Sequence, residues 1–435
     1  MSVLTAPRAL QCALLRGEYI KALAQFRHVP LDVPVLRRLQ ANWDGIRRHL
    51  AGAAISRFDI FHHDTLRFSN EKFGVLIRER WGVQWRRTPK STRYTTNKEF
   101  WEEMYNCHLD IAECHELYKT IHDLQRLTIA CDLDGRNRVG WGPLNTKTSR
   151  NAPSGRNGVG RFIFSTPKWT RFLIRPAPGK ALAYLDWSGQ EFGLAAMLSG
   201  DENMRLAYES RDPYLWFART AHAAPHDATK ESHSLIRRNY KQATLALGYG
   251  QSVYGFANRM KLSEEAAQRI FDDYANLFPK FLRWRLEQEK RFYRTGKLST
   301  LYGWALHKGK DVGARTVLNF KPQATGAEMQ RSAAINMVER GVTVCASIHD
   351  AFLIEADIDC LEHDIAEARA AMDYASADLL DGYVLRVDVK RCSYPARFVD
   401  ADGAPMWAKI WAALEAVEAS NQDCLTDVGV PALQL

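Results

Sequence analysis

The sequence ALAYLDWSGQE at residues 181–191 contains a short apolar run that ends at Asp186. A second apolar stretch, TVCASIHDAFLI at residues 343–354, contains His349 and Asp350 near its middle. Apolar runs of this length bounded by polar residues predict buried β-strands. Because the two aspartates lie far apart in the chain, only the fold can bring them together.

Two neighbouring carboxylates repel each other unless cations lie between them. Asp186 and Asp350 are therefore candidate ligands of two Mg²⁺ ions, with Mn²⁺ as an alternative. A pair of such ions serves in-line phosphoryl and nucleotidyl transfer. Each aspartate also has a simpler interpretation, since Asp186 could cap a helix over residues 188–198 and Asp350 could be a turn residue.

The composition is that of a globular protein with an anionic partner. The 435 residues can form two or three subdomains, and the net charge of +9 favours nucleic acid as the partner. The eight cysteines include no CxxC pair, which predicts reduced thiols and a cytoplasmic location. No apolar stretch reaches the roughly 18 to 20 residues that cross a membrane, so we expect no membrane association.

Hydrophobic periodicity predicts mostly helical structure. The helical segments are expected over residues 1–60, 97–130 and 188–340. Three local signals mark helix ends: Asp32 as an N-cap before Pro34, Ser263 as a helix start and Gly296 as a helix end.

Other segments lack helical periodicity. Residues 343–356 predict a β-hairpin with His349 and Asp350 in its turn. Irregular structure is expected in the basic loop 84–96, in the segment 134–179 and at residues 420–435.

Arg237, Lys241, Leu245 and Tyr249 are spaced four residues apart, so on a helix they share one face. Arginine and lysine can hold a triphosphate, while leucine and tyrosine can bracket a base and a sugar. The alternative is a solvated basic face beside two core residues.

In chain order, the segments 186–191, 237–250 and 348–350 resemble the three polymerase motifs of family A DNA polymerases. Two flanking elements are also similar to the family: Thr148-Ser149-Arg150, and Arg315 with Asn319 and Gln323. The resemblance covers roughly residues 15–410. Three ordered motifs are far more specific than any one of them.

This resemblance implies an α+β fold, a right-hand polymerase with an antiparallel palm sheet, a helical thumb and helical fingers. The implied ranges are an N-terminal helical lead-in to the palm (1–70), the thumb (71–135), the first part of the palm (136–187), the fingers and adjoining helices (188–340), the second part of the palm (341–410) and a C-terminal tail (411–435).

The resemblance also implies roles for individual residues at the reacting atoms. Asp186 and Asp350 would hold the two metal ions, with the backbone carbonyl of Trp187 as a further ligand. Arg237 and Lys241 would bind the triphosphate, and Lys241 would donate a proton to the departing pyrophosphate.

The remaining roles concern the sugar, the base and the DNA. Tyr249 would close over the nascent base pair, Leu245 would lie in the nucleotide site, and Glu191 would exclude a 2′-hydroxyl. The residues expected to contact primer and template are Arg150, Arg315, Asn319, Gln323 and His349.

The chain departs from the family pattern at several of these positions. Leu245 stands where most relatives have an aromatic ring, so stacking on the nucleotide should be weaker. Ala351 follows Asp350 in place of the usual glutamate, which removes an acidic neighbour from the metal site. Tyr214 stands where a histidine is common.

The expected function is DNA-directed DNA synthesis from a primer 3′-end, with primer–template DNA and dNTPs as partners. We expect a monomer without proofreading, because too few residues precede the polymerase-like region for an exonuclease domain. A separate processivity or exonuclease partner stays open. The alternatives are a weak or inactive nucleic-acid-binding accessory protein on a polymerase scaffold, and a polymerase that uses ribonucleotides.

Overall fold

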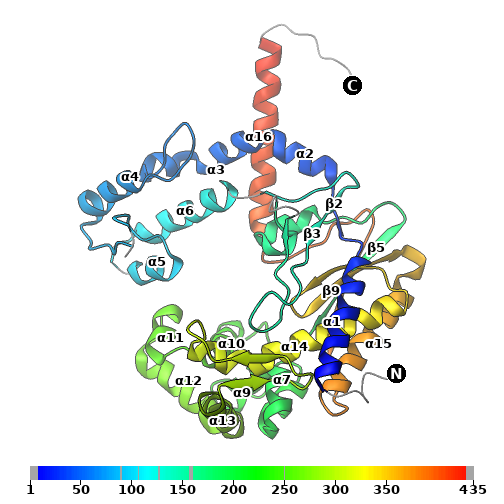
Figure 1. The fold of residues 1–435 in the computed structure, drawn as a ribbon. Helices are drawn as coiled ribbons and strands as arrows, with labels where there is room; N and C mark the ends of the chain where they lie inside the picture. The colour runs from blue at the N-terminus through cyan, green and yellow to red at the C-terminus, as the bar shows by residue number, and fades with distance from the viewer. Residues whose placement is uncertain are drawn as a thin grey trace. The chain divides into compact units, whose positions relative to one another are not determined.

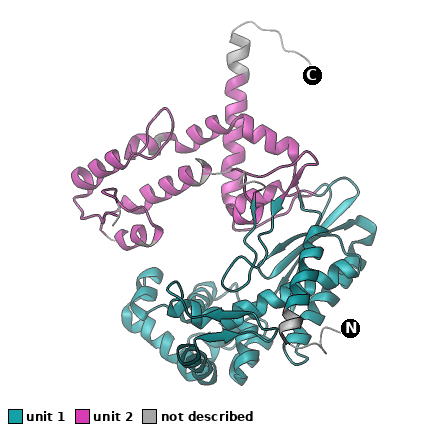
Figure 2. Cartoon of the chain, viewed as in Figure 1, with its two compact units in different colours: residues 1–29, 139–154, 176–395 teal, residues 30–138, 155–175, 396–435 magenta. Residues whose placement is uncertain are grey.

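The computed structural model describes residues 8–88, 91–105, 107–125, 128–155, 160–248 and 250–427 (Figure 1). The chain forms two compact units (Figure 2). Unit 1 comprises residues 1–29, 139–154 and 176–395, and unit 2 comprises residues 30–138, 155–175 and 396–435. None of the described helices is long and apolar enough to cross a membrane.

A four-stranded antiparallel sheet is the centre of unit 1. Its order is β10-β5-β9-β8, formed by β5 (Lys180–Trp187), β8 (Val344–Ile348), β9 (Ala351–Asp357) and β10 (Val387–Ser393). The predicted hairpin is confirmed, because β8 and β9 pair with only His349 and Asp350 between them. All five residues of β8 are buried, as an apolar run covered by helices requires.

Two helices pack against this sheet, and a third packs on one of them (Figure 1). Helix α15 (Leu361–Leu379) contacts β5 and β9, while α14 (Ala314–Glu339) contacts β8 and α15. Helix α1 (Arg8–Ala24) packs against α14. A Cβ added at Gly326 of α14 would lie 2.5 Å from the side-chain oxygen of Gln190, so the lack of a side chain there permits a close approach of α14 to the start of α7 (Gln190–Ser199).

The region predicted to be helical between residues 188 and 340 is confirmed. Ser263 caps α12 through its side chain, and Gly296 ends α13 in the left-handed conformation, both as predicted. The two helices are separate because Pro279 cannot continue the hydrogen bonding of α12. The elements that precede α14 are α7 (Gln190–Ser199), α8 (Glu202–Glu209), α9 (Pro213–Thr220), α10 (Ser234–Gly248), α11 (Val253–Met260), α12 (Glu264–Leu277), α13 (Pro279–Thr295), β6 (Lys297–Ser299) and β7 (Ala305–His307).

Unit 2 is mainly helical and has an aromatic core. The rings of Phe73, Trp81, Trp85 and Trp101 are buried, and Phe73 lies within 5.1 Å, centroid to centroid, of both Trp85 and Trp101. Its helices are α2 (Val33–Ala41), α3 (Trp43–Phe58), α4 (Asn70–Val75), the π-helix η2 (Leu76–Trp81), α5 (Lys98–Met104), α6 (Ile111–Gln125), the 3₁₀-helices η4 (Ile163–Ser165) and η5 (Lys168–Leu173), and α16 (Ala404–Asp427).

Several local predictions are confirmed in unit 2. Asp32 accepts a hydrogen bond from the Val35 N–H and caps α2. The basic segment 84–96 contains no helix among its described residues, and the exposed Arg86 has its guanidinium carbon 4.9 Å from the centroid of the Phe100 ring. The irregular structure expected at residues 420–435 is wrong for residues 420–427, because α16 continues to Asp427. Residues 428–435 lie outside the described part.

Candidate active site

The two aspartates lie at one end of the unit 1 sheet. Asp186 is near the end of β5 and pairs in register with Ala351 of β9, while Asp350 is in the adjoining β8–β9 turn. The Trp187 N–H donates a hydrogen bond to the Asp350 carbonyl oxygen at 3.1 Å. This backbone contact ties the end of β5 to the turn and places the aspartates beside each other.

Burial and charge repulsion raise the pKa of both carboxyl groups. Burial is the larger cause at Asp186, and the charges of Asp350 and Asp388 add to it, so that the Asp186 pKa rises to about 7. Burial also raises the pKa of Asp350. A divalent cation would relieve this repulsion and favour the ionised forms of both groups.

The side chains of Asp186 and Asp350 fit Mg²⁺ as two of its ligands, and they do not surround the ion completely. Carboxylate oxygens are the ligands that Mg²⁺ prefers. The Trp187 indole is a hydrogen-bond donor only, so the backbone carbonyl is the group of this residue that could contribute. Among the residues that the structure describes, no group of three or more His, Cys, Asp or Glu could hold a metal ion. Water and substrate phosphates would complete the coordination, as is usual for Mg²⁺.

We expect the contribution of Asp186 to the stability of the metal-free protein to fall as pH rises, because Asp186 keeps a proton in the folded state at pH values where the unfolded chain has released it. The contribution of Asp186 to the free energy of unfolding is fully present below about pH 4 and is lost as pH rises through about 7. The loss amounts to at most about 4 kcal/mol. Asp186→Asn should therefore raise the Tm at pH 8 and have little effect at pH 4, as measured by thermal unfolding in EDTA. The exposed Asp44→Asn is the control, and identical pH profiles of Asp186→Asn and native protein would contradict the expectation.

A cavity of about 370 Å³ adjoins Asp350. The structure brings seven predicted site residues together in its lining: Arg150, Glu191, Leu245, Asn319, Gln323, His349 and Asp350. Asp186, Trp187, Arg237, Lys241 and Arg315 do not line this cavity, and Tyr249 lies outside the described residues.

Arg150 and Glu191 form an ion pair in this cavity. Nη2 of Arg150 lies 2.7 Å from Oε1 of Glu191, and both side chains are largely shielded from solvent. Arg331 of α14 donates a hydrogen bond to the Ser149 carbonyl oxygen at 3.0 Å. This buried contact fixes the backbone from which Arg150 extends.

Ser149 is fully buried and has a φ of 59°, in the left-handed region that favours glycine. Its hydroxyl has no hydrogen-bond partner among the described residues. We expect Ser149→Gly to raise the free energy of unfolding by about 1 kcal/mol, since it removes both the backbone strain and an unsatisfied buried hydroxyl. Urea unfolding would measure the change, and Ser299→Gly in β6 should have the opposite sign because glycine weakens a strand.

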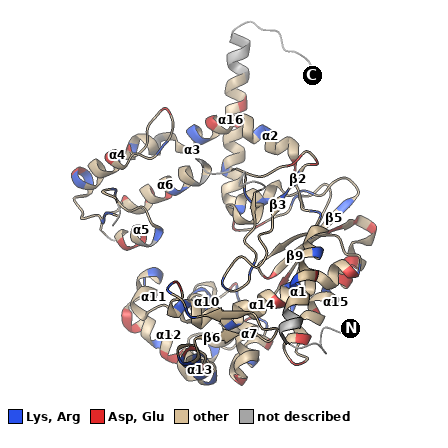
Figure 3. Cartoon of the chain, in the orientation of Figure 1, with Lys and Arg blue, Asp and Glu red and all other residues tan. Residues whose placement is uncertain are grey.

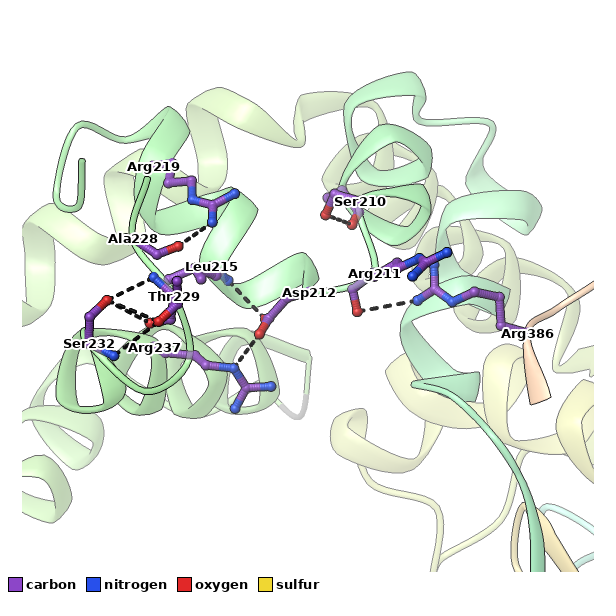
Figure 4. Close-up of polar contacts among 11 residues, drawn as sticks. Ser210, Arg211, Asp212, Leu215, Arg219, Ala228, Thr229, Ser232, Arg237 and Arg386 are labelled. Carbon is purple, nitrogen blue, oxygen red and sulfur yellow. Dashed lines mark hydrogen bonds and ion pairs between the residues drawn. The ribbon is translucent and has the colours of Figure 1, made fainter. Parts of the chain in front are cut away.

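Three residues of the predicted nucleotide-binding stripe, Arg237, Lys241 and Leu245, lie on α10. Arg237 pairs with Asp212, and its side chain is only 22% exposed, which disfavours a simply solvated basic face (Figure 4). Leu245 is half-buried and lines the cavity.

Lysines and arginines occur on elements of both units, so charge alone does not mark a binding face (Figure 3).

The residues predicted to contact DNA on α14 follow one helical face. Arg315 is exposed, whereas Asn319 and Gln323 are half-buried and line the cavity. Nδ2 of Asn319 donates a hydrogen bond to the Arg315 carbonyl oxygen at 2.9 Å. His349 is exposed and has a φ of 46° in the turn beside Asp350.

Sequence reasoning missed two carboxylates near the predicted residues. Asp388 of β10 pairs in register with Asp186 and accepts a hydrogen bond from the Ser188 hydroxyl. Asp212, just before α9, accepts a hydrogen bond from Nε of Arg237. Local signals for both residues were present in the sequence: the alternation Val387-Asp388-Val389 and the helix start Asp212-Pro213. Neither signal indicated that Asp388 pairs with Asp186 or that Asp212 binds Arg237.

A palm-like antiparallel sheet with two aspartates at one end, in a chain that also carries a helix with a basic stripe, defines a protein of the right-hand polymerase fold. The polymerase domain of Pol1 from M. smegmatis, solved in complex with DNA primer-template and dNTP, superposes with a TM-score of 0.70 and 20% sequence identity. The match covers 91% of this chain and 73% of the solved one.

The family model for DNA polymerase family A matches residues 59–392, and the chain belongs to this family. A thermostable DNA polymerase I of Thermus thermophilus is 25% identical over 260 residues, which cover 54% of this chain and 30% of the relative. DNA polymerase I of Mycobacterium tuberculosis is 23% identical over 359 residues, covering 75% of this chain and 38% of the relative. The chain thus spans about a third of the length of these curated relatives.

Proposed function

We propose that this chain is a DNA-directed DNA polymerase that adds deoxynucleotides to a primer 3′-end. The observation that carries the proposal is the half-buried pair Asp186 and Asp350 at the end of the unit 1 sheet, where Asp350 lines a cavity together with Arg150 and Glu191. Membership of family A supports nucleotidyl transfer, and the pair offers the ligands that such transfer needs.

In this proposal, Asp186, Asp350 and the Trp187 carbonyl would hold two Mg²⁺ ions, which when bound lower the pKa of the primer 3′-hydroxyl and offset charge on the leaving pyrophosphate. Arg237 and Lys241 bind and orient the triphosphate. Nζ of Lys241 donates a proton to the departing pyrophosphate oxygen.

The remaining assignments concern the sugar, the base pair and the DNA. The carboxylate of Glu191, held by Arg150, would occupy the space that a 2′-hydroxyl needs. Tyr249 and Leu245 would contact the nascent base pair. Arg150, Arg315, Asn319, Gln323 and His349 would contact primer and template.

The domain assignment is part of the same proposal. The thumb would be residues 71–135, the fingers residues 188–340 and the palm residues 136–187 with 341–410. The protein would act on primer–template DNA as a monomer, and we assign no proofreading to these residues.

Primer extension by the native chain with Mg²⁺ tests the proposal. We expect templated addition of dNTPs and much slower addition of rNTPs. Duplex binding without extension would favour an accessory protein on a polymerase scaffold, and equal use of rNTPs would favour a ribonucleotide-using polymerase.

Glu191→Ala should relax sugar discrimination. Removing the side chain opens space beside the sugar, so the ratio of kcat/KM for dNTP to that for rNTP should fall roughly tenfold to a hundredfold. Single-nucleotide insertion kinetics would measure this ratio. Glu191→Gln keeps the size of the side chain and serves as control, and equal ratios for native and Glu191→Ala would show that Glu191 is not the gate.

A further inference from the structure

The segment Asp212-Pro213-Tyr214 at the start of α9 contacts both cations of the α10 stripe. Oδ1 of Asp212 accepts a hydrogen bond from the Leu215 N–H at 3.1 Å, which caps α9. The other carboxylate oxygen accepts a hydrogen bond from Nε of Arg237 (Figure 4). One carboxylate therefore both begins α9 and holds a side chain of α10.

The Asp212 contact fixes only one edge of the Arg237 guanidinium group. Among the described residues, no hydrogen bond engages the Nη1 and Nη2 atoms of Arg237. A guanidinium group donates through a rigid planar fork, so holding it at Nε sets the direction of the two outer nitrogens. These nitrogens are the pair that can bind a phosphate in bidentate fashion.

The ring of Tyr214 lies under both cations. Its centroid is 5.6 Å from Cζ of Arg237 and 5.7 Å from Nζ of Lys241, within the range of cation–π attraction. The same ring packs edge-on against Phe192 of α7 at 6.3 Å and lines the cavity with Glu191. A single half-buried ring thus connects α7, α9 and both basic side chains of α10.

We propose that Asp212 and Tyr214 are positioning residues for triphosphate recognition: Asp212 orients Arg237, and the Tyr214 ring holds Arg237 and Lys241 side by side. The inference rests on the proposed function, which assigns the triphosphate to these cations. Holding long side chains in place before binding lowers the entropy that binding costs, by about 3- to 10-fold in affinity for each side chain held.

A purely structural role predicts a different pattern. If Asp212 served only to cap α9, Asp212→Asn would be silent, because asparagine caps helices as well as aspartate does. Asparagine keeps an oxygen for the Leu215 N–H but offers no second acceptor to Nε of Arg237. If Tyr214 served only as a packed apolar group, Tyr214→Leu would alter stability without a specific effect on triphosphate binding.

The test is calorimetric titration of the full chain with inorganic tripolyphosphate in Mg²⁺, with the Tm and the dNTP kinetics measured in parallel. Asp212→Asn and Tyr214→Leu should each weaken tripolyphosphate binding about 3- to 10-fold and raise the KM for dNTP by a similar factor, with kcat within about twofold of native. Tyr214→Phe keeps the ring and should restore binding relative to Tyr214→Leu.

Asp201→Asn is the matched control, since Asp201 caps α8 in the same way and its second oxygen accepts a hydrogen bond from the Phe281 N–H. Native affinity in Asp212→Asn and Tyr214→Leu, or no binding of tripolyphosphate by the native chain, would overturn the inference. Failure of the proposed function would appear separately, as absence of primer extension by a native chain that still binds tripolyphosphate.

Discussion

Asp350→Ala is expected to lower the rate of templated primer extension by at least about a thousandfold while leaving duplex binding near that of the native chain. The change removes one of two half-buried carboxylates that lie at the same end of the unit 1 sheet. A bound metal ion stabilises transition-state charge by several kcal/mol, and each 1.4 kcal/mol corresponds to about a factor of ten in rate. Ala351 offers no neighbouring carboxylate that could take over.

Single-turnover extension with saturating primer–template and dNTP would measure this effect. Asp357→Ala is the matched control, because Asp357 ends the same β9 strand and forms an exposed ion pair with Lys180 at 2.7 Å. Retention of a tenth or more of native activity by Asp350→Ala would remove Asp350 from the metal site.

Lys241→Gln should lower kcat/KM for dNTP by about a hundredfold to ten-thousandfold. The substitution removes a triphosphate-binding charge and the proposed proton donor together, and general-acid catalysis alone contributes factors of this size. Lys241→Arg separates the two roles. Arginine keeps the positive charge but does not release its proton, so KM should stay near native while kcat falls.

Steady-state kinetics across pH would distinguish these outcomes. Arg238→Ala is the control, since Arg238 is exposed and adjoins the stripe on the same helix. A native kcat in Lys241→Arg would contradict proton donation by Lys241, although phosphate binding could still hold.

The sequence could predict the elements whose signals are local. The β8–β9 hairpin follows from an apolar run interrupted by His349 and Asp350, and the caps at Asp32 and Ser263 follow from side chains that bond to their own helix. The family motifs then indicated which of these elements carry the site. The order of strands in the sheet required the whole fold.

The contacts that shape the site are long-range, and for that reason the sequence did not reveal them. Asp388 faces Asp186 only because β10 pairs with β5, and Arg150 meets Glu191 only because the irregular segment before β5 reaches the start of α7. Nothing in the spacing of Arg237 and Lys241 indicated that both lie over Tyr214. Periodicity identifies the face of a helix but not its neighbour.

The division of the chain into interleaved segments has a consequence for biosynthesis. Unit 1 uses residues 1–29, 139–154 and 176–395, and unit 2 needs residues 396–435. On the ribosome, β5 emerges about two hundred residues before its partner β10, so the sheet cannot be completed until most of the chain has been translated. We therefore expect nascent chains released before residue 387 to recruit chaperones and to be cleared by proteases. In such chains the sheet lacks its edge strand β10, so β5 is left as an unpaired edge.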